Sequence, residues 1–193
     1  MDWVSTWGVA MGAAWLSGVK LYASVLTLGL LQRFGLAHLP GELHVLGEWW
    51  VIAIAAVLCV VEFVADKVPA VDSTWDAIHT FVRIPAGAVL AAAAFGRFDA
   101  RVTLVALLVG GGLAAASHGT KAAARLAVNA SPEPFSNIAV SSVEEVGSVG
   151  LAALAAFHPV VTMAVVLVLT VLGIWVVRKM VRGIRRLFRR AAA

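Results

Sequence analysis

Charged side chains inside apolar segments are the residues of this sequence best placed to do chemistry. A charge at the centre of a membrane-spanning helix costs about 2.5–3.5 kcal/mol, so each must be paired with an opposite charge or solvated by a cavity. We expect ten groups to form a substrate-binding site: Lys20, Glu62, Asp66, Asp76, His79, Arg83, His118, Lys121, Glu144 and Glu145. Without the histidines and Asp76, and with Arg125 added, four basic and four acidic groups remain, which could neutralise one another completely.

Glu62 and Asp66 lie four residues apart, so a helix would project both carboxylates from one face. Two carboxylates placed in this way can hold a cation or share a proton. We therefore expect the acidic groups to bind a cation or proton, and the basic groups either to balance them or to hold an anionic cargo. A network of ion pairs that serves only folding is the alternative.

A second polar stripe follows, in which Asp72, Asp76, His79 and Arg83 recur at intervals of four, three and four residues. These intervals place the four groups on one helical face, which must point away from lipid. Asp72 could instead be the N-cap of this helix. Pro85 follows at once, so the helix can kink where the stripe ends, and broken helices that line a cavity are the usual construction of a transporter site.

Signatures of catalysis are missing from the sequence. No Cys/His cluster has the spacing of zinc ligands, and no convincing Ser/His/Asp set can be assembled. Gly110-Gly-Gly112 lacks the lysine and hydroxyl residue of a phosphate loop, and Cys59 is the only cysteine. We therefore expect no enzyme and no cofactor, and the sequence leaves a bound metal open.

The elements that must position these groups are helices in a membrane. The chain is 61% hydrophobic and only 13% charged, whereas soluble domains have about 25% charged residues. Apolar segments of roughly the length that a bilayer needs run over residues 3–31, 49–64, 77–95, 102–126, 138–157 and 160–177. The sequence thus predicts an all-α polytopic transmembrane helix bundle of about six spans, a single domain over residues 1–177. The first segment is long enough to be tilted or broken at Ser17-Gly18, and re-entrant segments would change the count.

Two short strings recur in the same order along the chain. Gly18-Val-Lys20 is followed by Val61-Glu62, and Gly119-Thr-Lys121 is followed by Val143-Glu144. Three spans in each half, about residues 3–98 and 101–177, would enter the membrane in opposite senses, which predicts an inverted 3+3 repeat. Chance similarity in an alanine-rich sequence is the alternative.

The last sixteen residues carry seven of the fifteen basic residues of the chain. Because this run follows an apolar segment directly, the positive-inside rule explains it better than nucleic-acid binding does. We expect residues 178–193 to form a basic amphipathic helix on the cytoplasmic leaflet. With six spans the N-terminus would be cytoplasmic too. The expected partner is the lipid bilayer, with a homo-oligomer left open and no nucleic acid.

Four strings resemble a bacterial membrane family of uncharacterised proteins, domain-of-unknown-function family 4126. They are Gly18-Val-Lys-Leu-Tyr-Ala23, Val61-Glu-Phe-Val-Ala-Asp-Lys-Val-Pro69, Val71-Asp-Ser-Thr-Trp-Asp-Ala-Ile-His-Thr-Phe81 and Ser131-Pro-Glu-Pro-Phe-Ser-Asn137. The resemblance implies a polytopic membrane protein and supplies no activity. Residues 62–67 also resemble the Glu-x-Gly-Asp-Lys/Arg motif of cation exchangers with duplicated halves, although the spacing differs by one and the glycine is absent. That second resemblance is an analogy only.

The leading interpretation is a transport protein, carrier or channel, for a small ion or charged solute. Its site would lie between the two halves, in the cytoplasmic (inner) membrane of a bacterium. Translocation of a lipid phosphate is the alternative within transport. A membrane scaffold that uses the ion pairs for folding is the alternative outside it.

Overall fold

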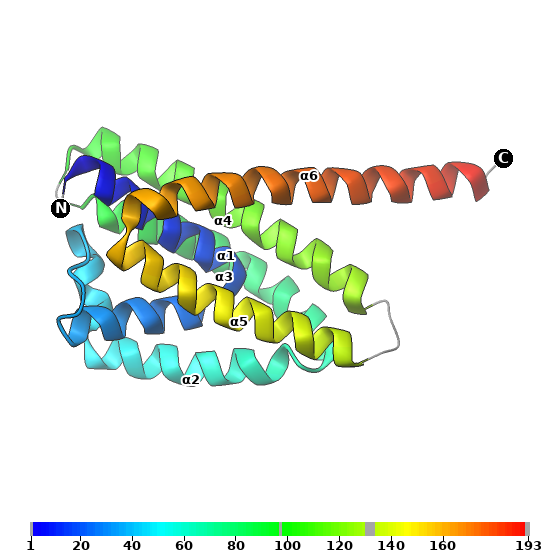
Figure 1. Ribbon diagram of the computed structural model, residues 1–193, viewed down its shortest axis with the longest axis horizontal. Coiled ribbons are helices and arrows are strands. Elements are labelled where there is room, and N and C mark those ends of the chain that lie inside the picture. Colours follow the sequence, from blue (N-terminus) through cyan, green and yellow to red (C-terminus); the bar gives the residue numbers. More distant parts are fainter. Residues whose placement is uncertain (1, 97, 130–133, 192–193) are drawn as a thin grey trace.

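The computed structural model describes residues 2–96, 98–129 and 134–191, and within these ranges the chain is helical with no strand. Its elements form an elongated bundle (Figure 1). They are α1 (Trp3–Arg33), the short 3-10 helix η1 (Gly41–Gly47), α2 (Trp49–Ala65), α3 (Pro69–Ala94), α4 (Ala100–Asn129), α5 (Pro134–Phe157) and α6 (Pro159–Ala191). The predicted all-α bundle is confirmed, and every expected span has its helix.

Helix α1 turns back on itself inside the bundle. Its backbone leaves the helical region at Lys20, where φ is −145° and ψ is 77°. The Trp3 ring lies 5.5 Å from the ring of Phe95, just past the end of α3, and the Arg33 guanidinium lies 4.8 Å from the ring of Trp49, at the start of α2. Both ends of α1 therefore lie at the same end of the bundle, with the break at its inner tip (Figure 1). The break was expected at Ser17-Gly18 and falls slightly later.

Five helices are long and apolar enough to cross a membrane, or six if η1 and α2, which meet at 71°, count as one span. The predicted number of about six agrees with this range. Because α1 returns to the end where it began, the N- and C-termini lie at opposite ends of the bundle (Figure 1). The expectation that both termini are cytoplasmic assumed six segments that each cross the membrane completely. In this fold α1 turns back and does not make a complete crossing.

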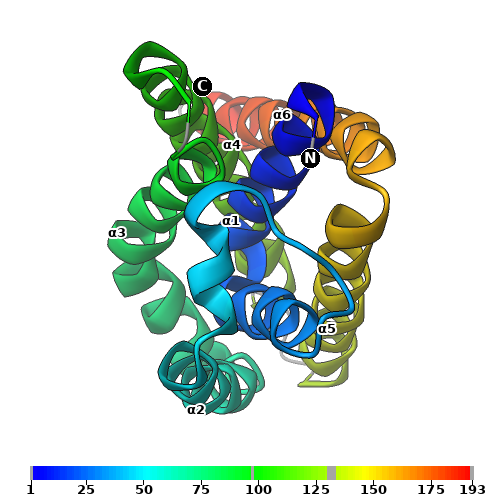
Figure 2. The ribbon, with the colours of Figure 1, turned by 90° about the vertical axis from the view of Figure 1, so that its left-hand side faces the viewer.

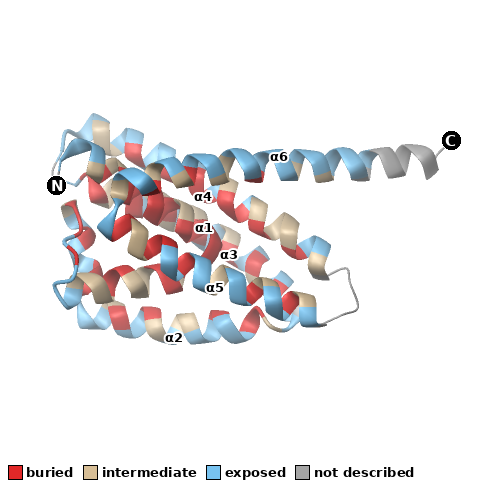
Figure 3. Cartoon of the chain, viewed as in Figure 1, coloured by how far each residue is buried: buried red, intermediate tan, exposed pale blue. Residues whose placement is uncertain are grey.

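The first half of α1 is the centre of the bundle, with α3 and α5 on opposite sides of it (Figure 2). Small residues permit this packing: a Cβ atom added to Gly12 would lie 2.9 Å from the Cβ atom of Ala155 in α5. The outer faces carry exposed apolar side chains such as Val57 and Val60 on α2 and Val171 on α6 (Figure 3). Charges inside and apolar groups outside are the arrangement that lipid demands.

Helix α6 is one continuous helix of 33 residues, about 50 Å long at 1.5 Å per residue. Its C-terminal part extends well beyond the other helices (Figure 1). Residues 178–191, where a basic amphipathic helix was expected, are helical and continue the last span without interruption.

Candidate functional site

Ten charged residues of five helices, eight of them buried and Glu144 and Glu145 partly exposed, meet in one network of ion pairs inside the bundle. Arg83 joins Glu62 to Asp76, Lys20 joins Asp66 to Glu145, and Lys121 and Arg125 connect these pairs to one another. The members are Lys20, Glu62, Asp66, Asp72, Asp76, Arg83, Lys121, Arg125, Glu144 and Glu145. We call these ten residues the buried ion network.

Arg83 ties α2 to α3 and is fully buried. Its Nη2 atom donates to Glu62 Oε1 at 2.5 Å and its Nη1 atom to Asp76 Oδ1 at 2.6 Å. Asp76 and Arg83 are seven residues apart, two helical turns, so both project from the same face of α3. The Ser17 hydroxyl donates to the backbone carbonyl of Arg83 at 2.6 Å, which fastens this face to α1.

Asp66 is the point where most of the cations meet. This carboxylate is fully buried and pairs closely with Lys20, while Lys121 Nζ and Arg125 Nη2 each lie 3.5 Å from its Oδ2 atom. Asp66 is also the C-cap of α2. Its backbone carbonyl accepts hydrogen bonds from Arg125 Nη1 at 3.3 Å and from Asn137 Nδ2 at 3.0 Å. The end of α2 is thereby tied to α4 and α5.

The break in α1 brings backbone carbonyls to the network. The last carbonyls of a helix have no partner within it and carry partial negative charge. Here the Val19 carbonyl accepts a hydrogen bond from Lys121 Nζ at 3.2 Å, and the Gly18 carbonyl lies 3.3 Å from His118 Nδ1. Lys20 itself reaches Glu145 Oε1 at 2.5 Å. Both lysines of the two Gly-x-Lys strings thus meet at one point.

The two histidines lie at the edge of the buried ion network and form hydrogen bonds to neutral groups. His79 Nδ1 lies 2.9 Å from the Trp75 carbonyl, and its Nε2 lies 3.1 Å from the Tyr22 hydroxyl. His118 Nε2 lies 2.7 Å from Thr80 Oγ1. The partners of His79 therefore suit a neutral ring with its proton on Nδ1.

The buried ion network is acidic overall. Its six carboxylates and four basic groups, all among the described residues, leave two negative charges when every group is ionised. The expected complete neutralisation is therefore wrong, because Asp72 and Asp76 join the four acids that were counted. Within the described part of the chain, Glu62 Oε2, Asp66 Oδ1 and Asp76 Oδ2 are also buried without a hydrogen-bond partner.

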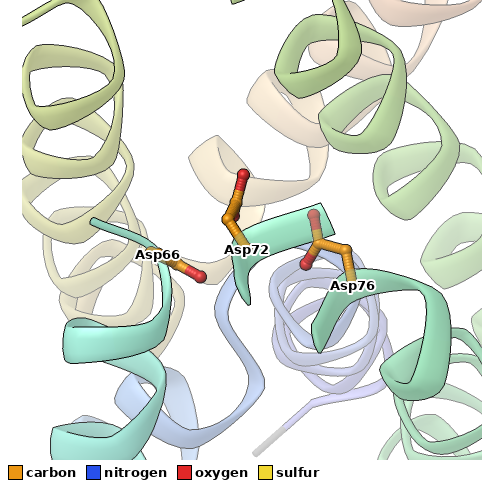
Figure 4. A group of neighbouring side chains, drawn as sticks. All are labelled: Asp66, Asp72 and Asp76. Carbon is orange, nitrogen blue, oxygen red and sulfur yellow. The ribbon is translucent and has the colours of Figure 1, made fainter. Parts of the chain in front are cut away.

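Three of these carboxylates come close together where α2 passes into α3. Asp66, Asp72 and Asp76 each offer an oxygen atom, and these atoms lie within 4.8 Å of one another (Figure 4). All three residues are buried. Carboxylate oxygens are ligands for hard cations such as Mg²⁺, Ca²⁺ and Mn²⁺. This group, which we call the acidic triad, is the part of the network that could hold a metal ion.

Two cavities reach the network from outside. One of about 190 Å³ lies between α3 and α4, and its walls include Asp76, Thr80, His118 and Arg125. Another of about 510 Å³ lies between α1, α5 and α6, and its walls are mostly apolar apart from Glu144 and Ser148. The charged groups are therefore not sealed on every side.

The structure brings together eight of the ten expected site residues and places His79 and His118 beside them. Arg125 and Asp72 belong to the same network although the expected site omitted them. The four-residue spacing between Asp72 and Asp76 indicated that Asp72 lies on the same helical face as the site. The sequence was equally consistent with Asp72 as the N-cap of this helix. The N-cap of α3 is Val68, and Asp72 is buried in the first turn of the helix.

Asn137 also belongs to the site, although the expected set omitted it. It lies inside α5, which begins at Pro134. The Asn137 Oδ1 atom accepts from Arg125 Nη1 at 2.6 Å. Nothing in the sequence marks this asparagine as a partner of the network. Most of the turn before it, residues 131–133, lies outside the described residues.

The helices that carry the two repeated strings do not support the predicted inverted repeat. Lys20 lies at a break, whereas α4 runs without interruption through Lys121. The charges of the two strings nevertheless meet, as expected. They meet closer to one end of the helices than to their middle, because Glu62 lies in the last turn of α2 and Asp72 in the first turn of α3.

Comparison with known proteins gives one match. A model of the family described as Domain of unknown function (DUF4126) matches residues 8–179. A search of curated proteins found no match, and a search of solved structures found none either.

Proposed function

The chain belongs to the DUF4126 family, whose description assigns no activity, and we propose that it is a membrane transport protein for a small cation. The observation that carries this proposal is the acidic excess of the buried ion network. When every group is ionised, two negative charges inside the bundle are uncompensated, which is costly. Charged residues inside membrane spans commonly mark ion pathways. A cation or protons bound among the carboxylates would remove this cost.

The broken helix α1 supports the same function. Discontinuous helices whose free carbonyls point at a site are a common device for binding cations in secondary transporters. The carbonyl of Val19 at the break faces the ammonium group of Lys121. Arg83 is paired with Glu62 and Asp76 at 2.5–2.6 Å, and we expect these pairs to separate when a cargo passes. This favours a carrier over an open channel.

The orientation follows from the tail of α6. The network lies near the α2–α3 end of the bundle, and α6 extends past the other helices at that same end (Figure 1). Its basic side chains include Arg178, Lys179 and Arg182. We propose that this end faces the cytoplasm of a bacterial inner membrane, by the positive-inside rule. The N-terminus then lies on the opposite side.

A scaffold without transport is the second candidate, and the close pairing of the network favours it. Buried pairs can be kept for folding specificity alone. An excess of acids is a poor design for such a role, because a neutral set would cost less to bury. Translocation of a lipid phosphate is favoured only by the apolar cavity beside Glu144, and the acidic excess opposes a phosphate cargo.

The test is cation flux into liposomes that contain the purified protein. Protons, Na⁺, K⁺, Mg²⁺, Ca²⁺ and Mn²⁺ would be compared for wild type and for Asp76→Asn, which removes a carboxylate that is buried and lines a cavity. The control is Glu48→Gln, an exposed acid at the other end of α2. We expect flux of at least one cation, lost in Asp76→Asn and kept in Glu48→Gln. Flux that equals protein-free liposomes for every cation would reject transport.

A further inference from the structure

We propose that the acidic triad, Asp66, Asp72 and Asp76, is a site for one hard divalent cation, and that Lys121 competes with that cation for it. This inference rests on the proposed transport function, since it names the class of cargo. It can be tested by binding alone.

The charge of the surroundings selects a divalent ion. The network holds two negative charges in excess when all its groups are ionised, and a single divalent cation would neutralise them. A monovalent cation would leave one charge buried and uncompensated, which is costly in an apolar interior. The donor atoms are carboxylate oxygens, which favour Ca²⁺, Mg²⁺ or Mn²⁺ over softer metals.

The spacing of the triad fits a single ion. Two ligands on opposite sides of Ca²⁺ are about 4.6–5.2 Å apart, because each bond is about 2.3–2.6 Å long. One oxygen of each triad residue lies within 4.8 Å of the others, so all three can ligate an ion of this size. Asp72 and Asp76 lie one helical turn apart on α3, and Asp66 faces them from the end of α2 (Figure 4).

Two oxygen atoms of the triad that lack a hydrogen-bond partner among the described residues are a second, independent indication of a bound ligand. Asp66 Oδ1 and Asp76 Oδ2 have no hydrogen-bond partner in the described part of the chain, although Asp66 is fully buried and Asp76 is 4% exposed. A buried acceptor without a partner is costly, and more so when it is charged. Bonds to a metal ion would satisfy both atoms at once.

Lys121 is the least tightly held cation of the network. Its Nζ atom lies 3.3 Å from Asp76, 3.5 Å from Asp66 and 3.8 Å from Glu144, whereas every other basic member has an ion pair of 2.6 Å or shorter. Its hydrogen bond goes to the Val19 carbonyl at the break of α1. The ammonium therefore stands between two triad carboxylates with an alternative partner within reach. An arriving cation would displace it towards that carbonyl.

The experiment measures Mn²⁺ binding to the purified full-length protein, from the loss of the free Mn²⁺ signal in electron paramagnetic resonance. We expect one site per chain, with Ca²⁺ and Mg²⁺ as competitors and Na⁺ without effect. Asp72→Asn should weaken binding roughly 10–100-fold, since affinity follows the number of charged ligands. Lys121→Met should tighten it about tenfold or more, because it removes a competing positive charge. Glu48→Gln should bind as wild type does.

Each outcome decides something, provided that thermal unfolding shows the variants to be folded. Absence of binding in folded wild type, or binding that Asp72→Asn and Lys121→Met leave unchanged, overturns the divalent site. In that case flux of protons or Na⁺ into liposomes would still uphold transport. Binding with the expected pattern of variants but no flux of any cation would keep the site and reject the transport function.

Discussion

The backbone conformation differs between two strings of the same form, Gly18-Val-Lys20 in α1 and Gly119-Thr-Lys121 in α4. The backbone leaves the helix at Lys20, whereas α4 continues through Lys121. Gly18 packs so closely on α4 that an added Cβ atom would overlap the Ala114 carbonyl oxygen, but an added Cβ on Gly119 would meet nothing within 4 Å. Local sequence therefore does not decide the break, and the tertiary surroundings do.

The two lysines also differ in how they are held. Lys20 is fully buried and pairs closely with Asp66 and Glu145, while Lys121 has only ion pairs of 3.3 Å or longer. The break at Lys20 frees the carbonyl that Lys121 binds. The two regions are thus complementary parts of one site, in which Lys20 is held by closer ion pairs than Lys121.

The largest expected loss of stability comes from removing Lys20, the more closely paired of the two lysines. Lys20→Met should lower the free energy of unfolding by about 3–5 kcal/mol, because it leaves Asp66 and Glu145 without their closest cation. Lys179→Met, on the exposed part of α6, should change it by less than about 0.5 kcal/mol. Unfolding by denaturant in detergent would measure both. Equal stability of Lys20→Met and wild type would contradict a structural role for Lys20.

A pair of glycine substitutions gives the next largest difference. Gly18→Ala should destabilise by about 1–3 kcal/mol, because its methyl group would overlap Ser117 and Ala114. Gly119→Ala should be neutral or stabilising by up to about 1 kcal/mol, since there is room and alanine favours a helix. Midpoints of thermal unfolding in detergent would show the contrast. Equal losses in both variants would mean that the two strings pack alike.

The smallest effect concerns the hydroxyl beside the break. Ser24 Oγ donates to the Lys20 carbonyl at 2.6 Å in a buried place, while Ser142 Oγ makes the same type of bond to Ile138 at 2.8 Å on an exposed face. Ser24→Ala should cost about 1 kcal/mol and Ser142→Ala close to nothing, because only the Ser24 hydroxyl also fills space inside the bundle. Denaturant midpoints of the two variants would be compared. A larger loss for Ser142→Ala would contradict the account of the break.

The helices could be predicted from the sequence because long apolar runs are bounded by loop residues. Each of the six expected segments overlaps one helix, and most of their ends agree with the helix within a few residues. Two ends differ more: α6 continues to Ala191, well beyond the expected residue 177, and α3 begins at Pro69, well before the expected residue 77. The polar stripe from Asp72 to Arg83 hid this start, since its apolar content is low. In the structure, Asp72, Asp76 and Arg83 of this stripe belong to the buried ion network.

Convergence of the charges could be predicted for a physical reason as well, since each alone would face hydrocarbon. The net negative charge of the network could not be predicted. Asp72 and Asp76 lie near the end of a helix, where a carboxylate can equally be a cap or lie in water. They are buried because Lys121 and Arg125 of α4 pair with them and because the first half of α1 packs against their helix. Neither of these features has a local signal in the sequence.

The most direct test of the account is tracer exchange in liposomes, with the transported cation at equal concentration inside and outside. Exchange needs no driving force, so it reports passage through the site alone. Glu62 is buried, and its Oε2 atom has no hydrogen-bond partner in the described part of the chain. We expect exchange in wild type and in Glu48→Gln, and none in a folded Glu62→Gln. Equal exchange in Glu62→Gln and wild type would contradict the claim that the buried acidic network carries the cation.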